Sequence, residues 1–191
     1  YSRLPINLIV KHKLVLAGPF ADNEVCVIKE WISSFGLPLE YVVFLGFVND
    51  KELLNLYRIC YLFIFPSLHE GFGLPVLEAM NCGAPVIASN CTSLPELIGS
   101  SEFLFDPLSV KEIIDLILKS LTDNSFYSKL LSNSREQKKK FSWKKTSENT
   151  INAFKEILKR KNLDLRKINE TDVANFQVKE YSKLIYKFQQ S

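Results

Sequence analysis

Short apolar runs alternate along the chain with stretches in which apolar residues return every three or four positions. The runs are a few residues long, and most end at a glycine or a proline, as strands do when a turn follows. Because consecutive residues of the third run, Leu62–Phe65, are apolar, both faces of that strand are expected to be covered. The predicted strands are Lys13–Gly18, Tyr41–Leu45, Leu62–Phe65, Pro85–Ala88 and Phe103–Phe105.

The stretches between these runs have the spacing of helices. Apolar residues from Val25 to Phe35 predict a helix that ends at Gly36. Asp50 is the expected N-cap of the next helix. The other predicted helices are Leu74–Asn81, Leu94–Ile98, Val110–Leu121, Phe126–Phe141 and Trp143–Lys161.

Strands that alternate with helices predict βαβ units and therefore an α/β fold. We expect a three-layer Rossmann-like domain with a mainly parallel sheet and a helical C-terminal end. In such a sheet ligands bind at the carboxyl ends of the strands, so functional residues are expected after Gly18, Gly46, Pro66 and Ser89. We assign residues 1–161 to this domain and residues 162–191 to a polar tail, either helical or a linker.

Composition narrows the class of protein. With 47% apolar and 24% charged residues, the 191-residue chain fits one globular domain with a substantial core. No run approaches the ~18 apolar residues that a membrane span requires. Residues 1–7 lack the basic and apolar regions of a signal peptide. The chain does not begin with Met, so we expect the natural protein to start earlier.

The cysteines and histidines do not indicate a metal site. The four cysteines have no C-x-x-C spacing, so buried reduced thiols are favoured over structural zinc or disulfides. Two histidines are too few for a His-rich site. We therefore expect no metal cofactor, and a protein located in the cytoplasm or at the inner face of the membrane.

Charge is distributed unevenly along the chain. The segment 135–167 carries twelve basic and four acidic residues, a net charge of +8, while the remainder carries −5. Such a segment can face an anionic membrane or nucleic acid, although it is more often a solvated helix face. Nucleic acid is disfavoured because no interleaved aromatic residues or known motif accompany the charge. Peripheral membrane contact stays open.

The stretch Ser67–Met80 carries the strongest signal for function. It follows the third strand, where an α/β sheet binds ligands. Gly71 and Gly73 permit backbone conformations and a close approach that a side chain would prevent, and Pro75 fits the first turn of a helix. The amides of residues 72–74 would then be donors at a helix N-terminus, a favourable place for a phosphate or a sugar oxygen.

Two carboxylates flank these amides. Glu70 precedes the glycines, and Glu78 lies one turn into the helix. A carboxylate accepts hydrogen bonds in pairs, so each can hold a vicinal diol. Together with the amides, the two acids suit a ligand made of sugar, diphosphate and ribose. For either residue alone, a simpler explanation is equally good. Glu70 can be a turn residue, and Glu78 can be an acid that interacts favourably with the helix dipole.

The spacing of Glu70 and Glu78 is the E-x7-E of retaining glycosyltransferases with the GT-B fold. The surrounding sequence, FPSLHEGFGLPVLEAMNCGAPVIASN, closely resembles glycosyltransferase family 4, the group 1 glycosyl transferases. The likeness covers roughly residues 4–160. It continues in LVLAGP (Leu14–Pro19), VVFLGFVND (Val42–Asp50), TSLPELIG (Thr92–Gly99) and FSW (Phe141–Trp143).

The resemblance implies the C-terminal, donor-binding half of a GT-B enzyme and a role for each site residue. Glu70 would be the catalytic residue, in contact with hydroxyls of the transferred sugar, and Glu78 would hold the ribose. Ser89 and Asn90 are pocket candidates without an assigned role. The other residues expected to bind the nucleotide sugar are Val48, in the wall of the base pocket, and Gly71, Phe72, Gly73 and Leu74.

The implied reaction is transfer of a hexosyl group from a UDP-sugar or GDP-sugar to a glycan or lipid acceptor, with retention and without a metal. The alternative is a non-catalytic Rossmann-like module that binds a nucleotide or a partner protein. Text similar to SSLPE near the motif favours mannosyl transfer. The sequence does not otherwise identify the sugar, the base or the acceptor.

The resemblance also implies parts that this chain does not supply. The family has a basic pair upstream of the first helix, which neutralises the diphosphate as it leaves, and Lys11 and Lys13 do not match that pair. An N-terminal domain binds the acceptor. We therefore expect activity from the full-length protein and none from this chain alone.

The last helix of the family crosses back to the N-terminal domain, and Trp143–Lys161 matches its position. Its apolar residues are then expected to form an exposed strip in this chain. They are Ile151, Phe154, Ile157 and Leu158.

Overall fold

The computed structural model describes residues 1–160. The described residues belong to two compact units, Tyr1–Lys140 and a second that begins at Phe141, and each unit is described separately. The tail predicted for residues 162–191 lies outside the described residues.

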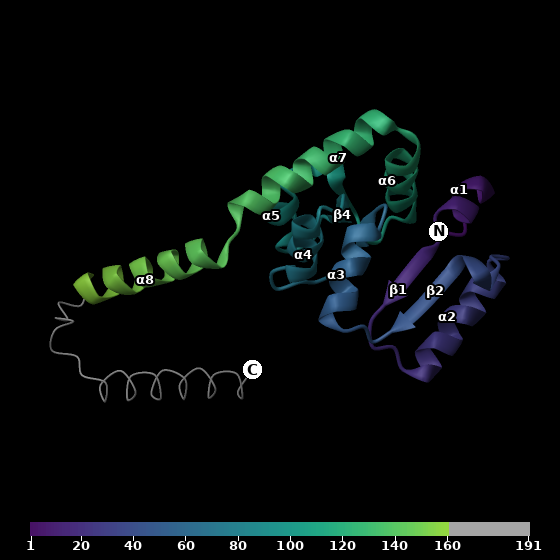
Figure 1. Cartoon of the computed structure of the whole chain (residues 1–191), viewed down its shortest axis with the longest axis horizontal. Coiled ribbons are helices and arrows are strands. Elements are labelled where there is room, and N and C mark those ends of the chain that lie inside the picture. The colour runs from purple at the N-terminus through teal and green to yellow at the C-terminus, as the bar shows by residue number, and fades with distance from the viewer. Residues whose placement is uncertain (161–191) are drawn as a thin grey trace. The chain divides into compact units, whose positions relative to one another are not determined.

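All five predicted strands form in the first unit, and their pairing is parallel throughout (Figure 1). The expected α/β class is therefore confirmed. The strands make two sheets, β1–β2 and β3–β4–β5, with β4 in the centre of the second. Their bounds are β1 (Leu14–Ala17), β2 (Val42–Gly46), β3 (Phe63–Phe65), β4 (Val86–Ser89) and β5 (Leu104–Phe105).

The helices between the strands agree with the predicted ones to within a few residues. The six-residue helix α1, which precedes β1, was not predicted. The helix predicted to end at Phe141 instead ends at Gln137 and continues as one 3-10 turn. The helices of the first unit are α1 (Ile6–Lys11), α2 (Asp22–Ser34), α3 (Asp50–Ile59), α4 (Leu74–Cys82), α5 (Leu94–Ile98), α6 (Val110–Thr122) and α7 (Asn124–Gln137). The 3-10 turns are η1 (Leu39–Tyr41), η2 (Ser101–Phe103) and η3 (Lys138–Lys140).

The N-cap of α3 is Asn49, and the prediction of Asp50 is wrong by one residue. The side-chain oxygen of Asn49 accepts a hydrogen bond from the amide of Glu52, at 3.0 Å. In return, the carboxylate of Glu52 accepts one from the amide of Asn49, also at 3.0 Å. This reciprocal capping box satisfies two amides at once, which Asp50 as N-cap could not do with Glu52.

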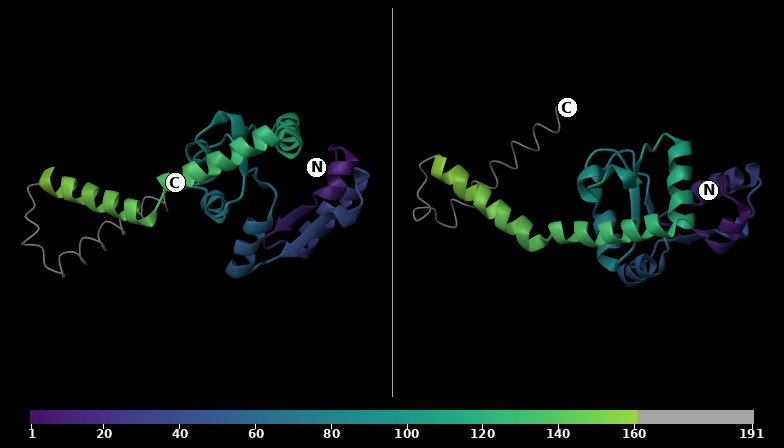
Figure 2. Two further views of the ribbon diagram at one scale, coloured as in Figure 1. Left: turned by 45° about the horizontal axis from the view of Figure 1, so that its top comes forward. Right: turned by 90° about the horizontal axis from the view of Figure 1, so that it is seen from above.

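The core of the first unit is centred on β4. All four residues of β4 are fully buried, and α4, α5 and α7 contact this strand (Figures 1 and 2). The first sheet is covered less completely, since Val15 in β1 is 45% exposed. Helix α2 packs on β2, where the ammonium of Lys29 lies 5.9 Å from the centre of the Phe44 ring. Among the strands of the described residues, β4 is therefore the most completely buried, and its last residue, Ser89, contacts the loop that follows β3.

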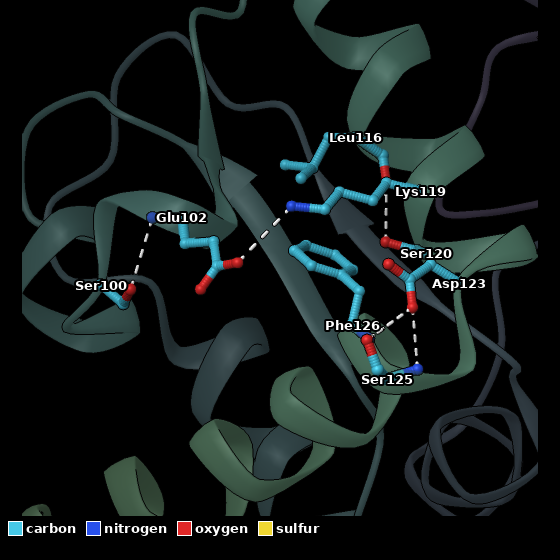
Figure 3. Close-up of polar contacts among 8 residues, drawn as sticks. All are labelled: Ser100, Glu102, Leu116, Lys119, Ser120, Asp123, Ser125 and Phe126. Atoms are coloured by element: carbon cyan, nitrogen blue, oxygen red, sulfur yellow. Dashed lines mark hydrogen bonds and ion pairs between the residues drawn. The ribbon is translucent and has the colours of Figure 1, made fainter.

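The corner between α6 and α7 is held by polar contacts (Figure 3). The ammonium of Lys119 lies 4.2 Å from the centre of the Phe126 ring and 3.5 Å from the carboxylate of Glu102. Asp123 is the N-cap of α7 and accepts hydrogen bonds from the amides of Ser125 and Phe126, at 2.9 and 3.0 Å. These bonds, that from Phe126 foremost, lower the pKa of Asp123. The corner fixes the direction in which α7 runs across β4.

Within the described residues, the second unit consists mainly of α8 (Trp143–Arg160). The predicted apolar strip on this helix is confirmed: Ile151, Phe154 and Ile157 are 50%, 60% and 49% exposed. Leu158 is intermediate in exposure. Among residues 1–160, no helix is long and apolar enough to cross a membrane.

Candidate functional site

The loop between β3 and α4 lies at the carboxyl end of a strand, as the sequence predicts. Helix α4 begins at Leu74, with Pro75 in its first turn and Gly73 as its N-cap. Gly73 has a φ of 96°, and a Cβ there would lie 2.8 Å from Leu94 and 2.9 Å from Leu97 of α5. Both the conformation and the packing therefore require glycine at this position.

Gly71 differs from Gly73 in both respects. Its φ is not in the left-handed region, and a Cβ there would meet nothing within 4 Å. No contact of the chain with itself explains a glycine at residue 71. Space beside the backbone of residue 71 is compatible with the close approach of a ligand. At the start of α4 the amide of Leu74 has no acceptor within the helix, Pro75 has no N–H, and the amide of Val76 donates to the carbonyl of Gly73 at 3.0 Å.

Side chains from the end of β4 and from the segment after it hold the backbone of this loop. The hydroxyl of Ser89, which is fully buried, donates to the carbonyl of Ser67 at 2.5 Å. Thr92 Oγ1 accepts from the amide of Glu70 at 3.1 Å. Ser93 Oγ donates to the carbonyl of Phe72 at 2.9 Å and to that of Glu70 at 3.3 Å. Hydrogen bonds thus join the loop after β3 to the carboxyl end of β4 and the residues that follow it.

The two acids of the motif lie at either side of the start of α4. Glu70 is half-buried in the loop, and Glu78 is exposed on α4. Tyr57 of α3 donates its hydroxyl to Glu78 Oε2 at 3.3 Å. Tyr57 is only 5% exposed, and its ring packs edge-on against Phe63, with the ring centres 5.2 Å apart.

Burial and the neighbouring Glu78 carboxylate raise the pKa of Tyr57 well above its ordinary value. The phenol therefore keeps its proton at any physiological pH and remains a donor to the carboxylate. A carboxylate held on one oxygen leaves the other free to accept bonds from a ligand. The contact with Tyr57 holds Glu78 by Oε2 alone.

Val48 lies in the loop between β2 and α3, beside an open hollow of about 370 Å³. On α3 the hollow is lined by Glu52, Asn55, Leu56 and Ile59. These positions share one face of the helix, and Tyr57 points to the opposite face, because successive residues turn by about 100°. The structure therefore places the hollow and the Tyr57–Glu78 pair on different sides of α3.

The remaining candidates have simpler surroundings. His69 is exposed, and its carbonyl accepts a hydrogen bond from Ser67 Oγ at 2.9 Å. The amide of Asn90 donates to the carbonyl of Phe105 at 2.8 Å, which extends the β4–β5 pairing by one residue. Within residues 1–160, no group of three or more His, Cys, Asp or Glu side chains is arranged to hold a metal ion.

Sequence reasoning did not find Tyr57, Thr92 or Ser93 as site residues. Thr92 and Ser93 belong to the TSLPELIG segment, which is part of the family resemblance. That resemblance indicates that they lie near the motif, but it does not predict their hydrogen bonds to it. Tyr57 has no comparable signal, because in the sequence it occupies an ordinary apolar position of a helix. The partners of these side chains are 21 to 23 residues away in the chain.

Comparison with known proteins gives matches over most of the chain. Residues 1–140 match the family model described as Glycosyl transferases group 1. The Serotype-specific mannosyltransferase WbdA of Escherichia coli is 44% identical over 158 residues, which are 83% of this chain and 19% of that protein. The O-antigen chain mannosyltransferase B of Escherichia coli is 39% identical, over 81% of this chain and 40% of that protein.

A solved structure is similar as well. The crystal structure of Anabaena Alr3699/HepE in complex with UDP-glucose superposes with a TM-score of 0.60 and 27% identity. The superposition covers 71% of this chain and 39% of the HepE chain. The chain thus spans about a fifth of the length of WbdA and two fifths of the other two proteins.

Proposed function

This chain belongs to the group 1 glycosyl transferases, and we propose that it is the donor-binding domain of a retaining hexosyltransferase. Its fold is that of the C-terminal domain of GT-B enzymes. The observation that carries the proposal is the loop between β3 and α4, where Glu70 and Glu78 flank the first amides of a helix. Residues 1–161 form the proposed domain.

We assign the site residues as the family resemblance implies. Glu70 contacts hydroxyls of the transferred sugar, and Glu78 holds the ribose. The backbone of Gly71, Phe72, Gly73 and Leu74 reaches the sugar and the diphosphate, where a helix N-terminus favours negative charge. Val48 forms part of the wall around the base. The hollow beside Val48 lies on the other side of α3 from the Tyr57–Glu78 pair.

The proposed donor is a nucleotide diphosphate mannose. Two relatives, 44% and 39% identical, are named mannosyltransferases. UDP and GDP are both candidate nucleotides, and UDP is supported by a structural relative that is in complex with UDP-glucose. The proposed acceptor is a glycan or a lipid, bound by a further domain, with the enzyme in the cytoplasm or at the inner face of the membrane.

We propose that the anomeric configuration is retained because the reaction is a front-face substitution, in which the leaving phosphate assists the incoming acceptor. The rule that relates carboxylate separation to stereochemistry concerns glycoside hydrolysis and does not apply to this pair. Glu78 is assigned to the ribose, far from the anomeric carbon, so it has no nucleophilic role. Cations that neutralise the leaving diphosphate, and the acceptor domain, would complete the site.

Binding of donors to the 191-residue chain tests the proposal. Calorimetric titration with UDP, GDP, UDP-glucose and GDP-mannose should give saturable binding for at least one base, and stronger binding when the sugar is present. Glu78→Ala should weaken that binding, whereas Glu30→Ala, a matched exposed acid on α2, should not. Transfer to an acceptor should be absent.

Each outcome decides one part of the proposal. If no nucleotide binds, the donor site is wrong, and a partner-binding module becomes the better explanation. If Glu78→Ala binds as tightly as the unmodified chain, the ribose assignment is wrong. Sugar transfer by the chain alone would show that it already contains a complete active site.

A further inference from the structure

We infer that Thr92 is a positioning residue that aims Glu70 at the donor sugar, an inference that rests on the proposed function. Thr92 stands just before α5, in the segment that follows β4, and is 22 residues from Glu70 in the chain. The hydrogen bond of its side chain is to the backbone amide of Glu70, so this bond does not occupy the Glu70 carboxylate.

The backbone of Thr92 is strained. Among the described residues it is the one non-glycine residue with a positive φ, of 50°. A β-branched side chain is unfavourable in this left-handed region, where glycine or asparagine is the usual choice. A residue keeps such a conformation only when its surroundings impose it, and strain of this kind is concentrated at functional sites.

The hydrogen bonds explain what the strain achieves. Thr92 Oγ1 accepts from the amide of Glu70 at 3.1 Å. The neighbouring Ser93 donates to the carbonyl of the same residue at 3.3 Å and to that of Phe72 at 2.9 Å. Both peptide groups of Glu70 are thereby held by one dipeptide. With both peptide groups fixed, the direction of the Cα–Cβ bond of Glu70 is fixed as well.

The rest of the loop is anchored from the same side. Ser89 holds the carbonyl of Ser67 from the buried end of β4, and Gly73 packs closely on Leu94 and Leu97 of α5. The loop therefore has fixed points before and after Glu70. Thr92 supplies the fixed point at the amide of Glu70 itself, and loss of its hydroxyl should disturb Glu70 more than the rest of the loop.

The test compares donors with and without the sugar. Thr92→Val keeps the shape and the branching but removes the acceptor. It should lower the affinity for the nucleotide sugar about five- to tenfold, as expected for one lost hydrogen bond, with the affinity for the nucleotide alone changed less than about twofold. Thr92→Ser, which keeps the hydroxyl, should restore the sugar-dependent part. Thr122→Val, a matched change on the exposed face of α6, should change neither affinity.

Thr92→Gly separates position from stability. Glycine accepts a φ of 50° without strain, so thermal stability should be maintained or raised while the sugar-dependent affinity falls as in Thr92→Val. A purely structural role predicts the opposite, a loss of stability and a parallel loss of affinity for both ligands. Parallel losses, or full sugar-dependent affinity in Thr92→Val, would overturn the inference.

A measurement without ligand distinguishes failure here from failure of the proposed function. In the ¹⁵N-labelled chain, the amide of Glu70 should exchange with solvent faster in Thr92→Val than in the unmodified chain or in Thr92→Ser. Equal exchange rates would overturn the contact itself, whatever the chain binds. Faster exchange in a chain that binds no nucleotide would contradict the proposed function and, with it, the role of Thr92 toward a sugar.

Discussion

The hydroxyl of Tyr57 and the carboxylate of Glu78 join α3 to α4 through a hydrogen bond of 3.3 Å. Tyr57 is buried and Glu78 is exposed. A side chain packed in the core therefore holds a carboxylate at the surface. Since the pKa of Tyr57 is raised by its burial and by Glu78, the hydroxyl stays protonated and the bond persists at neutral pH.

Tyr57→Phe is expected to weaken nucleotide binding about fivefold, since a lost hydrogen bond of this kind costs about 1 kcal/mol. Calorimetry with the nucleotide measures the effect. Tyr61→Phe, which keeps the ring that stacks on Tyr127, is the matched control and should bind normally. If Tyr57 acts through Glu78, the double variant Tyr57→Phe/Glu78→Ala should bind no more weakly than Glu78→Ala alone. Additive losses would contradict that coupling.

Gly73→Ala is expected to destabilise the chain by about 2–4 kcal/mol, because it adds left-handed strain to a close contact with α5. Urea denaturation measures the loss as a lower midpoint. Gly71→Ala should change stability by less than about 0.5 kcal/mol, since its Cβ meets open space. Weakened donor binding in Gly71→Ala at unchanged stability would support close approach of a ligand there. Equal stability losses in both variants would contradict this account of Gly73.

Asn49→Ala is expected to cost about 1 kcal/mol of stability, the usual effect of losing an N-cap. Asp50→Ala should cost about 0.5 kcal/mol or less, because an acid in the first turn contributes only through the helix dipole. Thermal unfolding of the two variants side by side gives the comparison. A larger loss for Asp50→Ala would return the cap to Asp50.

Acidification is expected to lower stability through His12. The centre of its ring lies 4.7 Å from the centre of the Tyr61 ring. Burial, with a smaller effect from Lys11, lowers the pKa of His12 below its ordinary value of 6.5. The unfolded chain then binds the proton more readily than the folded one, so the free energy of unfolding falls as pH drops below about 6.5. The melting temperature should therefore fall between pH 7 and 5.

His12→Phe, which keeps a ring against Tyr61, should make the melting temperature less dependent on pH over that interval. His69→Gln, a change at an exposed loop histidine, is measured beside it for comparison. An unchanged pH dependence in His12→Phe would exclude His12 as its source.

Local patterns in the sequence were sufficient to predict the strands and most helices. The apolar runs that end at Gly46 and before Pro66 form the strands β2 and β3. Helix α5 has the predicted bounds because Pro95 lies in its first turn and Gly99 ends it. The short helix α1 was missed, since its six residues span fewer than two turns and show little periodicity. The N-cap of α3 was misplaced by one residue because Asn49 and Asp50 are both good caps, and only the reciprocal bond with Glu52 distinguishes them.

The sequence by itself determined the α/β class, the position of the motif loop and the family, because each depends on residue types at short, fixed spacings. Tertiary structure decided that the strands form two sheets, that Tyr57 holds Glu78, and that a strained Thr92 holds the backbone of Glu70. These features depend on contacts between segments some 20 residues apart. Their energy comes from burial and hydrogen-bond geometry that no local pattern records.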